Sequence, residues 1–148
     1  MTESLDRQIV AALCRDGRTD VRSLAEGTDA VATTVQKHLR ALESDGVIEG
    51  YAARLDYGRL GYETAVVELA VELEAVDDVV TRLGDRREFV TVYQTTGEFT
   101  VFAVGKFESE AAVADCLRDL HDDPDVDSVR LNAVSSVVRE GGSPLLGD

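Results

Sequence analysis

Residues 33–51 read TTVQKHLRALESDGVIEGY. Val35, Leu39 and Leu42 recur at i, i+4 and i+7, which is the spacing of one apolar helix face. Gly46 predicts the end of this helix, and the apolar residues that follow the glycine are typical of a short strand. An apolar-backed helix, a glycine stop and a strand form the pattern of a winged helix-turn-helix, whose helix enters the major groove of DNA.

The opposite face of this predicted helix is basic and amide-bearing. Gln36, Lys37 and Arg40 fall on it, and no Asp or Glu occurs from Ala30 to Leu42, although the whole chain has a formal net charge of −14. Such a face suits contacts with DNA. The alternative interpretation is an ordinary solvated helix face.

Two shorter helices are predicted upstream. The first spans about residues 4–15, with Ser4 as its N-cap, and the second spans about residues 21–27, with Asp20 as its N-cap. Asp29 is a candidate cap for the third helix. Three short helices joined by tight polar turns predict a helix-turn-helix unit.

From Tyr62 onward the pattern changes to alternating strands and helices. Strands are expected over residues 63–73, 89–95, 99–107 and 126–138, and helices over residues 76–86 and 109–121. The order β-α-β-β-α-β is that of a ferredoxin-like domain. The chain is therefore expected to be an α+β protein with an N-terminal winged helix-turn-helix.

Four segments are predicted along the chain. Residues 1–55 are assigned to the helix-turn-helix domain, residues 56–61 to a linker with two glycines, residues 62–139 to the βαββαβ domain and residues 140–148 to a disordered tail.

Composition limits the partners and the location of the protein. The acidity is uneven, because residues 1–57 carry 7 basic and 10 acidic side chains whereas residues 58–148 carry 8 and 19. An acidic, lysine-poor chain is typical of salt-loving archaea, and in molar salt charges act over only about 3 Å. No run of 18 apolar residues and no signal peptide is apparent, so no membrane span and a cytoplasmic location are expected.

No catalytic or metal site is expected. Cys14 and Cys116 lie far apart without a CxxC neighbour, and both are predicted to be small buried residues. Only two histidines occur, and no nucleophile–base, paired-carboxylate or phosphate-loop pattern is visible. The sequence therefore predicts neither an enzyme nor a cofactor.

Several motifs together resemble the Lrp/AsnC, or feast/famine, family of transcription regulators of bacteria and archaea. They are Leu5-Asp6 with Ile9 and Leu13, Asp16-Gly17-Arg18, Ser23–Glu26, Thr34-Val35 with Leu39, Leu42-Glu43, Gly46–Tyr51, Leu60-Gly61 and Thr96–Phe99. The resemblance covers about residues 5–139, and the Gly-Val-Ile-x-Gly-Tyr run is its most specific part.

The resemblance implies a fold and a mechanism. The N-terminal domain would bind double-stranded DNA in a sequence-specific manner, and the C-terminal domain would be the family's RAM (ACT-like) ligand and assembly module. Its sheets would pair into homodimers, and dimers would join into octamers. An amino-acid effector bound between dimers would act as a linkage switch through its preference for one assembly state.

The candidate DNA contacts follow from the helix face and the family pattern. They are Thr33, Thr34, Gln36, Lys37, Arg40, Arg18 and Arg22, with Arg54 as a weaker candidate. Gln36 suits a bidentate bond to adenine, and Lys37 and Arg40 suit guanine or phosphate. His38 is predicted either to pack at the edge of the core or to contact phosphate.

The candidate effector site is the turn between the second and third strands of the βαββαβ domain. The resemblance points to Gly97, Glu98, Phe99 and Thr100, and the alternative is a plain β-turn. Many family members carry an acidic residue where Thr100 stands here, and a hydroxyl brings no charge to hold an ammonium group. A second departure is Val31-Ala32, where the family often has Ser-Pro, so that the cap of the third helix is expected at Asp29 or Thr28.

Assembly is also expected from the sheet, because two helices cover only one of its faces. Apolar side chains for both faces are expected from Val67, Leu69, Val71, Val101, Ala103 and residues 134–138. Two other functions remain open: a siroheme decarboxylase, which shares this architecture, and a small-molecule sensor with a vestigial DNA-binding domain.

Overall fold

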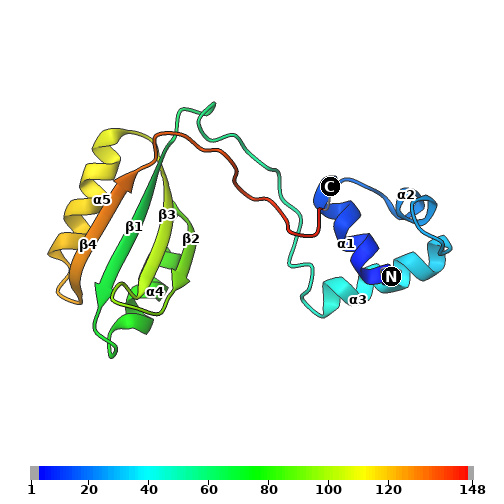
Figure 1. The fold of residues 1–148 in the computed structure, drawn as a ribbon, viewed down its shortest axis with the longest axis horizontal. Coiled ribbons are helices and arrows are strands. Elements are labelled where there is room, and N and C mark those ends of the chain that lie inside the picture. Colours follow the sequence, from blue (N-terminus) through cyan, green and yellow to red (C-terminus); the bar gives the residue numbers. More distant parts are fainter. Residues whose placement is uncertain (1–3, 147–148) are drawn as a thin grey trace. The chain divides into compact units, whose positions relative to one another are not determined.

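The computed structural model describes residues 4–146, and over that range the chain forms five helices and four strands (Figure 1). The chain separates into two compact units. One comprises Met1–Arg54 together with Arg139–Asp148, and the other comprises Leu55–Val138. We call the first unit the head and the second the sheet unit.

Three helices build the head: α1 Leu5–Arg15, α2 Val21–Glu26 and α3 Ala32–Ser44. The two predicted N-caps are confirmed. The Ser4 hydroxyl accepts a hydrogen bond from the Arg7 backbone N–H at 3.2 Å, and the Asp20 carboxylate accepts one from the Ser23 N–H at 2.8 Å. Each cap satisfies one of the backbone donors that a helix start leaves unpaired.

The predicted cap of α3 is wrong. Neither Asp29 nor Thr28 occupies the N-cap position, which belongs to Val31 and has no side-chain hydrogen bond. The Thr28 hydroxyl instead accepts from the Ala30 N–H and donates to the Ala25 carbonyl, both at 3.2 Å. Thr28 is therefore used to close the turn after α2, and α3 begins too late for either side chain to reach its first free N–H groups.

The core of the head is small and takes residues from all three helices. Ile9 of α1, Leu24 of α2, and Val35 and Leu42 of α3 are buried together, with Leu39 partly buried against them. The apolar face predicted for α3 is confirmed. It fixes the rotation of α3, because residues at i, i+4 and i+7 must all face the other two helices.

Gly46 ends α3, as predicted, in a left-handed conformation with φ of 79°. The strand predicted after it is wrong, because no helix or strand is assigned between Ser44 and Glu63. An extended segment becomes a strand only when a neighbouring strand pairs with its N–H and C=O groups, and the described chain supplies no such neighbour here. Tyr51 is nevertheless held, since its hydroxyl donates to the Glu43 carboxylate at 3.1 Å.

Six elements build the sheet unit: β1 Glu63–Val71, α4 Val76–Gly84, β2 Phe89–Gln94, β3 Val101–Phe107, α5 Glu110–Asp122 and β4 Val126–Ala133. All neighbouring strands are antiparallel, in the order β2-β3-β1-β4. The predicted βαββαβ order and the ferredoxin-like fold are confirmed.

The last strand is shorter than predicted. Ala133 pairs with Ala65 of β1, and the Val134 N–H donates to the Thr64 carbonyl at 2.9 Å. Beyond that bond β1 offers no further partner, because it begins at Glu63. The apolar run after Ala133 therefore continues without pairing.

The two faces of the sheet differ in composition. Val67, Leu69, Val101 and Ala103 are fully buried in one cluster with residues of α4 and α5, and Val71 joins this cluster with 7% of its surface exposed. The sequence predicts that these five residues, together with residues 134–138, supply both faces; that prediction is wrong for the five, since all of them lie on the helix-covered side. Strand alternation turns the intervening residues to the opposite face.

The two cysteines are both free thiols. Cys116 is 1% exposed in the core beneath α5, as predicted, and this burial is the main cause that raises the pKa of its thiol. Cys14 is only half-buried, which corrects the prediction. Cys14 follows the fully buried Ile9 by five residues, which turns it about 140° around α1 from Ile9, so the core covers it only in part.

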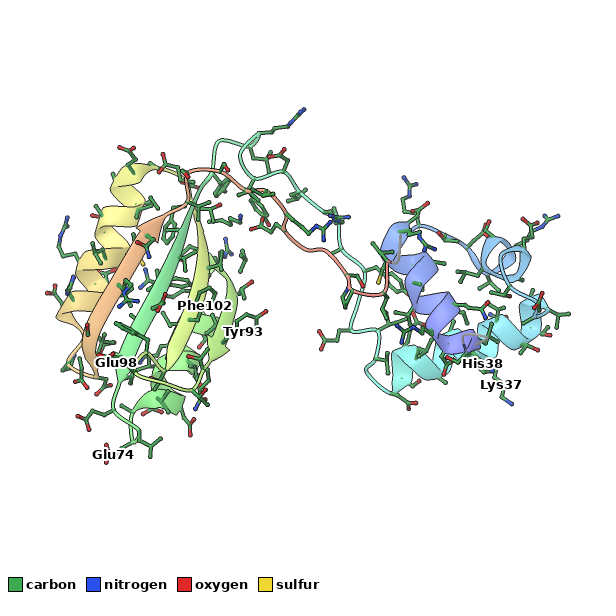
Figure 2. The ribbon with its side chains drawn as sticks, viewed as in Figure 1. Lys37, His38, Glu74, Tyr93, Glu98 and Phe102 are labelled. Carbon is green, nitrogen blue, oxygen red and sulfur yellow. The ribbon has the colours of Figure 1, made fainter. Side chains whose placement is uncertain are left out.

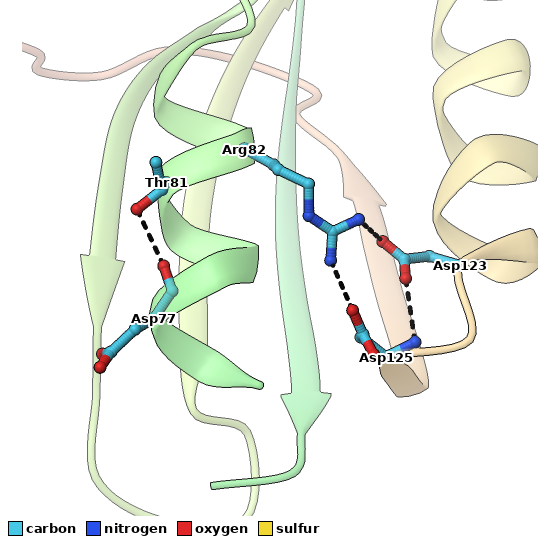
Figure 3. A network of polar contacts seen from close by, with 5 residues as sticks. All are labelled: Asp77, Thr81, Arg82, Asp123 and Asp125. Carbon is cyan, nitrogen blue, oxygen red and sulfur yellow. Dashed lines mark hydrogen bonds and ion pairs between the residues drawn. The ribbon is translucent and has the colours of Figure 1, made fainter. Parts of the chain in front are cut away.

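Arg82 joins α4 to the segment between α5 and β4 (Figure 3). Its guanidinium donates to the Asp123 carboxylate at 2.7 Å and to the Asp125 carboxylate at 2.9 Å. Asp123 also accepts from the Asp125 backbone N–H at 2.9 Å. One planar cation thereby holds two acidic side chains in the turn after α5.

We predict that Arg82→Ala lowers the free energy of unfolding of the sheet unit by about 1 kcal/mol, because the bond to the largely covered Asp123 is lost. Urea unfolding followed by circular dichroism measures this change. Arg118→Ala is the matched control, since the ion pair of Arg118 within the described residues is with exposed Asp115 of its own helix. Its loss should cost less than about 0.5 kcal/mol. Equal losses in the two variants would contradict the role given to Arg82.

Candidate nucleic-acid interface and effector turn

The outer face of α3 is exposed along its length. Five of the predicted contact residues are exposed on it: Thr33, Thr34, Gln36, Lys37 and Arg40. Lys37 points away from the body of the head (Figure 2). Burial of Val35 and Leu42 on the opposite side leaves these polar side chains no other orientation.

This face is cationic and has no internal neutralising partner. The first turn of α3 contains no acidic residue, and neither Lys37 nor Arg40 forms an ion pair with any residue in the described range 4–146. Arg22 of α2 differs, because its guanidinium lies 3.9 Å from Glu26, although both side chains remain largely exposed. The two cations of α3 are therefore available to an external anion.

His38 occupies the edge between α1 and α3. Its Nδ1 atom lies 2.7 Å from the Asp6 carboxylate, and the side chain is 40% exposed. Of the two alternatives predicted for His38, this position favours packing at the edge of the core, because the ring is engaged by α1.

Two of the remaining predicted DNA contacts, Arg18 and Arg22, lie around the start of α2. Arg18 is exposed in the turn before this helix, and Arg22 is exposed in its first turn. Asp20 stands between them as the N-cap. Arg54 is exposed at the end of the extended segment that follows α3.

Asp20 has a pKa below its ordinary value. The main cause is the hydrogen bond from the Ser23 backbone N–H, followed by the Ser23 hydroxyl and the nearby charge of Arg22. These interactions favour the ionised carboxylate, which is the form that accepts hydrogen bonds at a helix start.

The predicted effector turn joins β2 to β3. The Thr95 N–H donates to the Thr100 carbonyl and the Thr95 hydroxyl donates to the Phe99 carbonyl, both at 2.8 Å. Gly97 has a φ of 112°, a conformation that side chains rarely adopt, so a glycine is needed at the tip. Thr100 attaches the turn to β1, because its N–H donates to the Leu69 carbonyl at 2.9 Å and its hydroxyl donates to the Val71 carbonyl at 3.4 Å.

A cavity of about 310 Å³ lies beside this turn and is lined by residues of β1, β3 and the turn itself. Two of the four predicted effector residues, Glu98 and Phe99, line it, whereas Gly97 and Thr100 do not. Gly97 and Thr100 shape the turn through the tip conformation and the bonds to β1. Figure 2 shows Glu98 in the turn and Phe102 on the adjoining strand.

Two charged residues at this site were missed by sequence reasoning. Glu68 of β1 lines the cavity, and Arg130 of β4 lies 3.5 Å from its carboxylate, with the guanidinium 4.3 Å from the centre of the Phe99 ring. Both lie on the face away from α4 and α5, where they pair across the β1–β4 ladder. The only sequence signal for Glu68 was its place between two apolar strand residues, Val67 and Leu69.

Two sequence-family profiles match the chain. The profile of winged helix-turn-helix DNA-binding domains matches residues 3–49, and that of the Lrp/AsnC ligand binding domain matches residues 64–144. The chain belongs to the Lrp/AsnC family. It is a helix-turn-helix transcriptional regulator of the Lrp/AsnC type with an effector-binding domain.

Named relatives agree with this assignment. The regulator LrpA1 of Halobacterium salinarum is 34% identical over 123 residues, which is 82% of this chain and 84% of that protein. LrpA of Mycobacterium tuberculosis is 30% identical over 118 residues, covering 78% of this chain and 79% of that protein. These Lrp/AsnC relatives are transcriptional regulators.

Solved structures share the fold over nearly the full chain. The leucine response regulatory protein LrpA of M. tuberculosis superposes with a TM-score of 0.84 at 26% identity and covers 97% of this chain and 99% of that one. A transcriptional regulator of Neisseria meningitidis in complex with L-methionine has a TM-score of 0.84 at 19% identity, over 95% of this chain and 94% of that one. At such identity the second likeness shows the fold alone.

Within residues 4–146, no three His, Cys, Asp or Glu side chains gather in a way that would hold a metal ion. The helices in the same range are too short or too polar to cross a membrane.

We predict that the Asp20 cap stabilises the head in a pH-dependent manner. Because the folded pKa is lowered, the contribution is present above the unfolded pKa, about 3.9, and is lost as the pH falls through the lower folded value. The difference in urea midpoint between wild type and Asp20→Asn should therefore be smaller at pH 3 than at pH 6. A difference that stays constant or grows at pH 3 would contradict this linkage.

Proposed function

We propose that the regulator reads duplex DNA in a sequence-specific manner through the outer face of α3, and that a small amino-acid effector binds beside the β2–β3 turn. The predicted segments take matching roles: residues 1–55 as the DNA-binding domain, 56–61 as the linker and 62–139 as the effector and assembly domain. The observation that carries the proposal is the exposed face of α3, on which Lys37 and Arg40 have no acidic partner among residues 4–146.

The chemistry of each side chain suggests its role on DNA. Gln36 can form two hydrogen bonds with the edge of adenine, and Arg40 can do the same with guanine. Lys37, Thr33 and Thr34 suit phosphate or base contacts at the start of the helix.

Arg18 and Arg22 flank the start of α2 and suit phosphates beside the groove. Contacts of this kind place the head on the duplex without reading sequence.

The net charge of −14 does not oppose this proposal. Most of the excess acid lies in the sheet unit, and in concentrated salt repulsion over more than about 3 Å is screened. Close contacts between α3 and DNA then decide affinity, so the local absence of acid on α3 matters more than the total charge.

We predict that Lys37→Ala/Arg40→Ala abolishes selective DNA binding. Wild type should enrich a defined sequence from a pool of random duplexes in concentrated potassium chloride, and the double variant should not. Each lost base contact should cost about 1–3 kcal/mol. If both side chains contact phosphates instead, the slope of log affinity against log salt should fall by roughly 2.

Arg87→Ala/Arg118→Ala is the charge-matched control, because both arginines are exposed in the sheet unit. This variant should bind as wild type does. Failure of wild type to enrich any sequence, or equal losses in the two double variants, would refute DNA reading by α3.

The effector proposal rests on the cavity beside the turn and on its charges. Relatives of this fold include a protein named as a leucine response regulator and one solved with L-methionine. Thr100 brings no charge for an amino group, whereas Glu68 and Glu98 both line the cavity. We assign the amine of the effector to one of these carboxylates, and Arg130 stands close enough to Glu68 to meet the carboxylate of the effector.

We predict that at least one amino acid from a tested panel raises the melting temperature of the wild-type protein. Glu68→Gln should lower the affinity for that amino acid at least tenfold. Loss of the charge removes the charge-assisted hydrogen bond to the ammonium group. Isothermal titration measures the affinity. Glu63→Gln, at the opposite end of β1, is the control and should bind normally; full affinity in Glu68→Gln would exclude Glu68 as the amine ligand.

We extend the proposal to assembly and to the absence of catalysis. The sheet face away from α4 and α5 carries half-buried Val66, Ala70 and Val104. A second copy of the chain would cover these residues in a homodimer with two-fold symmetry. An octamer is the higher assembly that the family pattern suggests. The relatives are regulators rather than enzymes, which supports a non-catalytic role.

A further inference from the structure

The C-terminal segment of the chain returns to the head. Arg139–Asp148 belongs to the same compact unit as Met1–Arg54, although β4 of the sheet unit precedes it directly in the chain. Figure 1 shows the red C-terminal end beside α1. The head is therefore connected to the sheet unit by two chain segments, one after Arg54 and one before Arg139.

Exposure along this segment shows where it makes contact. Val138 is 95% exposed, and the residues after it stay exposed until Ser143. Ser143, Leu145 and Leu146 are then half-buried. Two leucines that become covered at the end of an otherwise exposed, irregular segment indicate a specific contact at that end.

The contacting end has a defined local structure. The Leu145 N–H donates to the Ser143 hydroxyl at 3.2 Å, and the Leu146 N–H donates to the Ser143 carbonyl at 3.3 Å. Pro144 restricts the backbone between these bonds. Ser143–Leu146 is thus a compact turn that orders few additional rotatable bonds when it docks.

The surface that receives this turn is a groove between α1 and α2. The space is about 560 Å³ and is lined by Ala11, Ala12 and Leu24 of the helices together with Pro144 and Leu145 of the turn. Arg7 and Arg15 of α1 also line it. None of its lining residues belongs to α3, so an occupied groove leaves the recognition face of α3 open.

We propose that Ser143–Leu146 is an intramolecular latch that docks Pro144 and Leu145 into the α1–α2 groove of the head. The latch gives the head a second attachment to the sheet unit. This attachment uses a groove whose lining includes no residue of α3, the helix proposed to read DNA. Because a body attached at two points has fewer accessible orientations than a body on one linker, the latch restricts the motion of the head. A covered groove also protects the amides of α1 and α2.

Hydrogen–deuterium exchange of the full chain tests the latch. Leu145→Asp/Leu146→Asp places one charge in the groove and a second at the half-buried position after it, and should release the turn. Amides of residues 5–15 and 21–26 should then exchange at least threefold faster, while those of β1 and β3 keep the wild-type rate. Val138→Asp is the matched control, since Val138 is almost fully exposed in the same segment, and it should exchange as wild type does.

A substitution in the groove itself provides a second test of the latch. Ser23 lines the groove at the third position of α2, where glutamine is well tolerated at a helix start. Ser23→Gln should fill the groove, speed exchange in α1 and give no additional effect when it is combined with the leucine variants. Unchanged exchange of α1 and α2 in the leucine variants, or fully additive effects, would overturn the latch. The measurement uses no DNA, so its outcome is independent of the proposed function.

Discussion

Apolar contact between α3 and the two preceding helices is the interaction on which the head depends. Val35 and Leu42 are buried against Ile9 and Leu24, and this contact alone determines which side of α3 faces water. The polar residues that suit DNA are then exposed by geometry, because they alternate with the buried ones at helical period. If α3 reads DNA as proposed, its two faces serve the fold and the function, so a change that rotates α3 would damage both.

In the sheet unit, too, buried and exposed side chains lie on opposite faces of one element, but along a strand they alternate at every second residue. β1 lies between β3 and β4, and its buried residues pack under α4 and α5 while Glu68 faces the other side. That arrangement brings a carboxylate of β1, a guanidinium of β4 and the aromatic ring of the β2–β3 turn together. A charged, partly apolar cavity beside a rigid turn is suited to a small zwitterion, for which both charges need partners.

Charge distribution explains how an acidic protein can be a DNA-binding regulator. The acid is concentrated in the sheet unit, whereas α3 contains no acid in its first turn. In molar salt, charges of the sheet unit that lie more than about 3 Å from a duplex would be screened. The latch segment adds a mechanical element, because it attaches the head at α1 and α2 and leaves α3 free. In the proposed mechanism, effector binding and DNA reading lie on separate units that the chain connects twice.

The sequence by itself determined the features that obey local rules. The caps at Ser4 and Asp20, the glycine stop at Gly46 and the βαββαβ order all depend on residues a few positions apart, so periodicity and turn chemistry were sufficient to predict them. Only the tertiary structure decided the rest. In the described chain, the segment after α3 finds no pairing strand and β4 ends where β1 begins. Glu68 pairs with Arg130 across the sheet, and Leu145 lines a groove of α1 and α2. Each of these outcomes depends on partners far apart in the chain, and no local pattern encodes which distant backbone or side chain will be within reach.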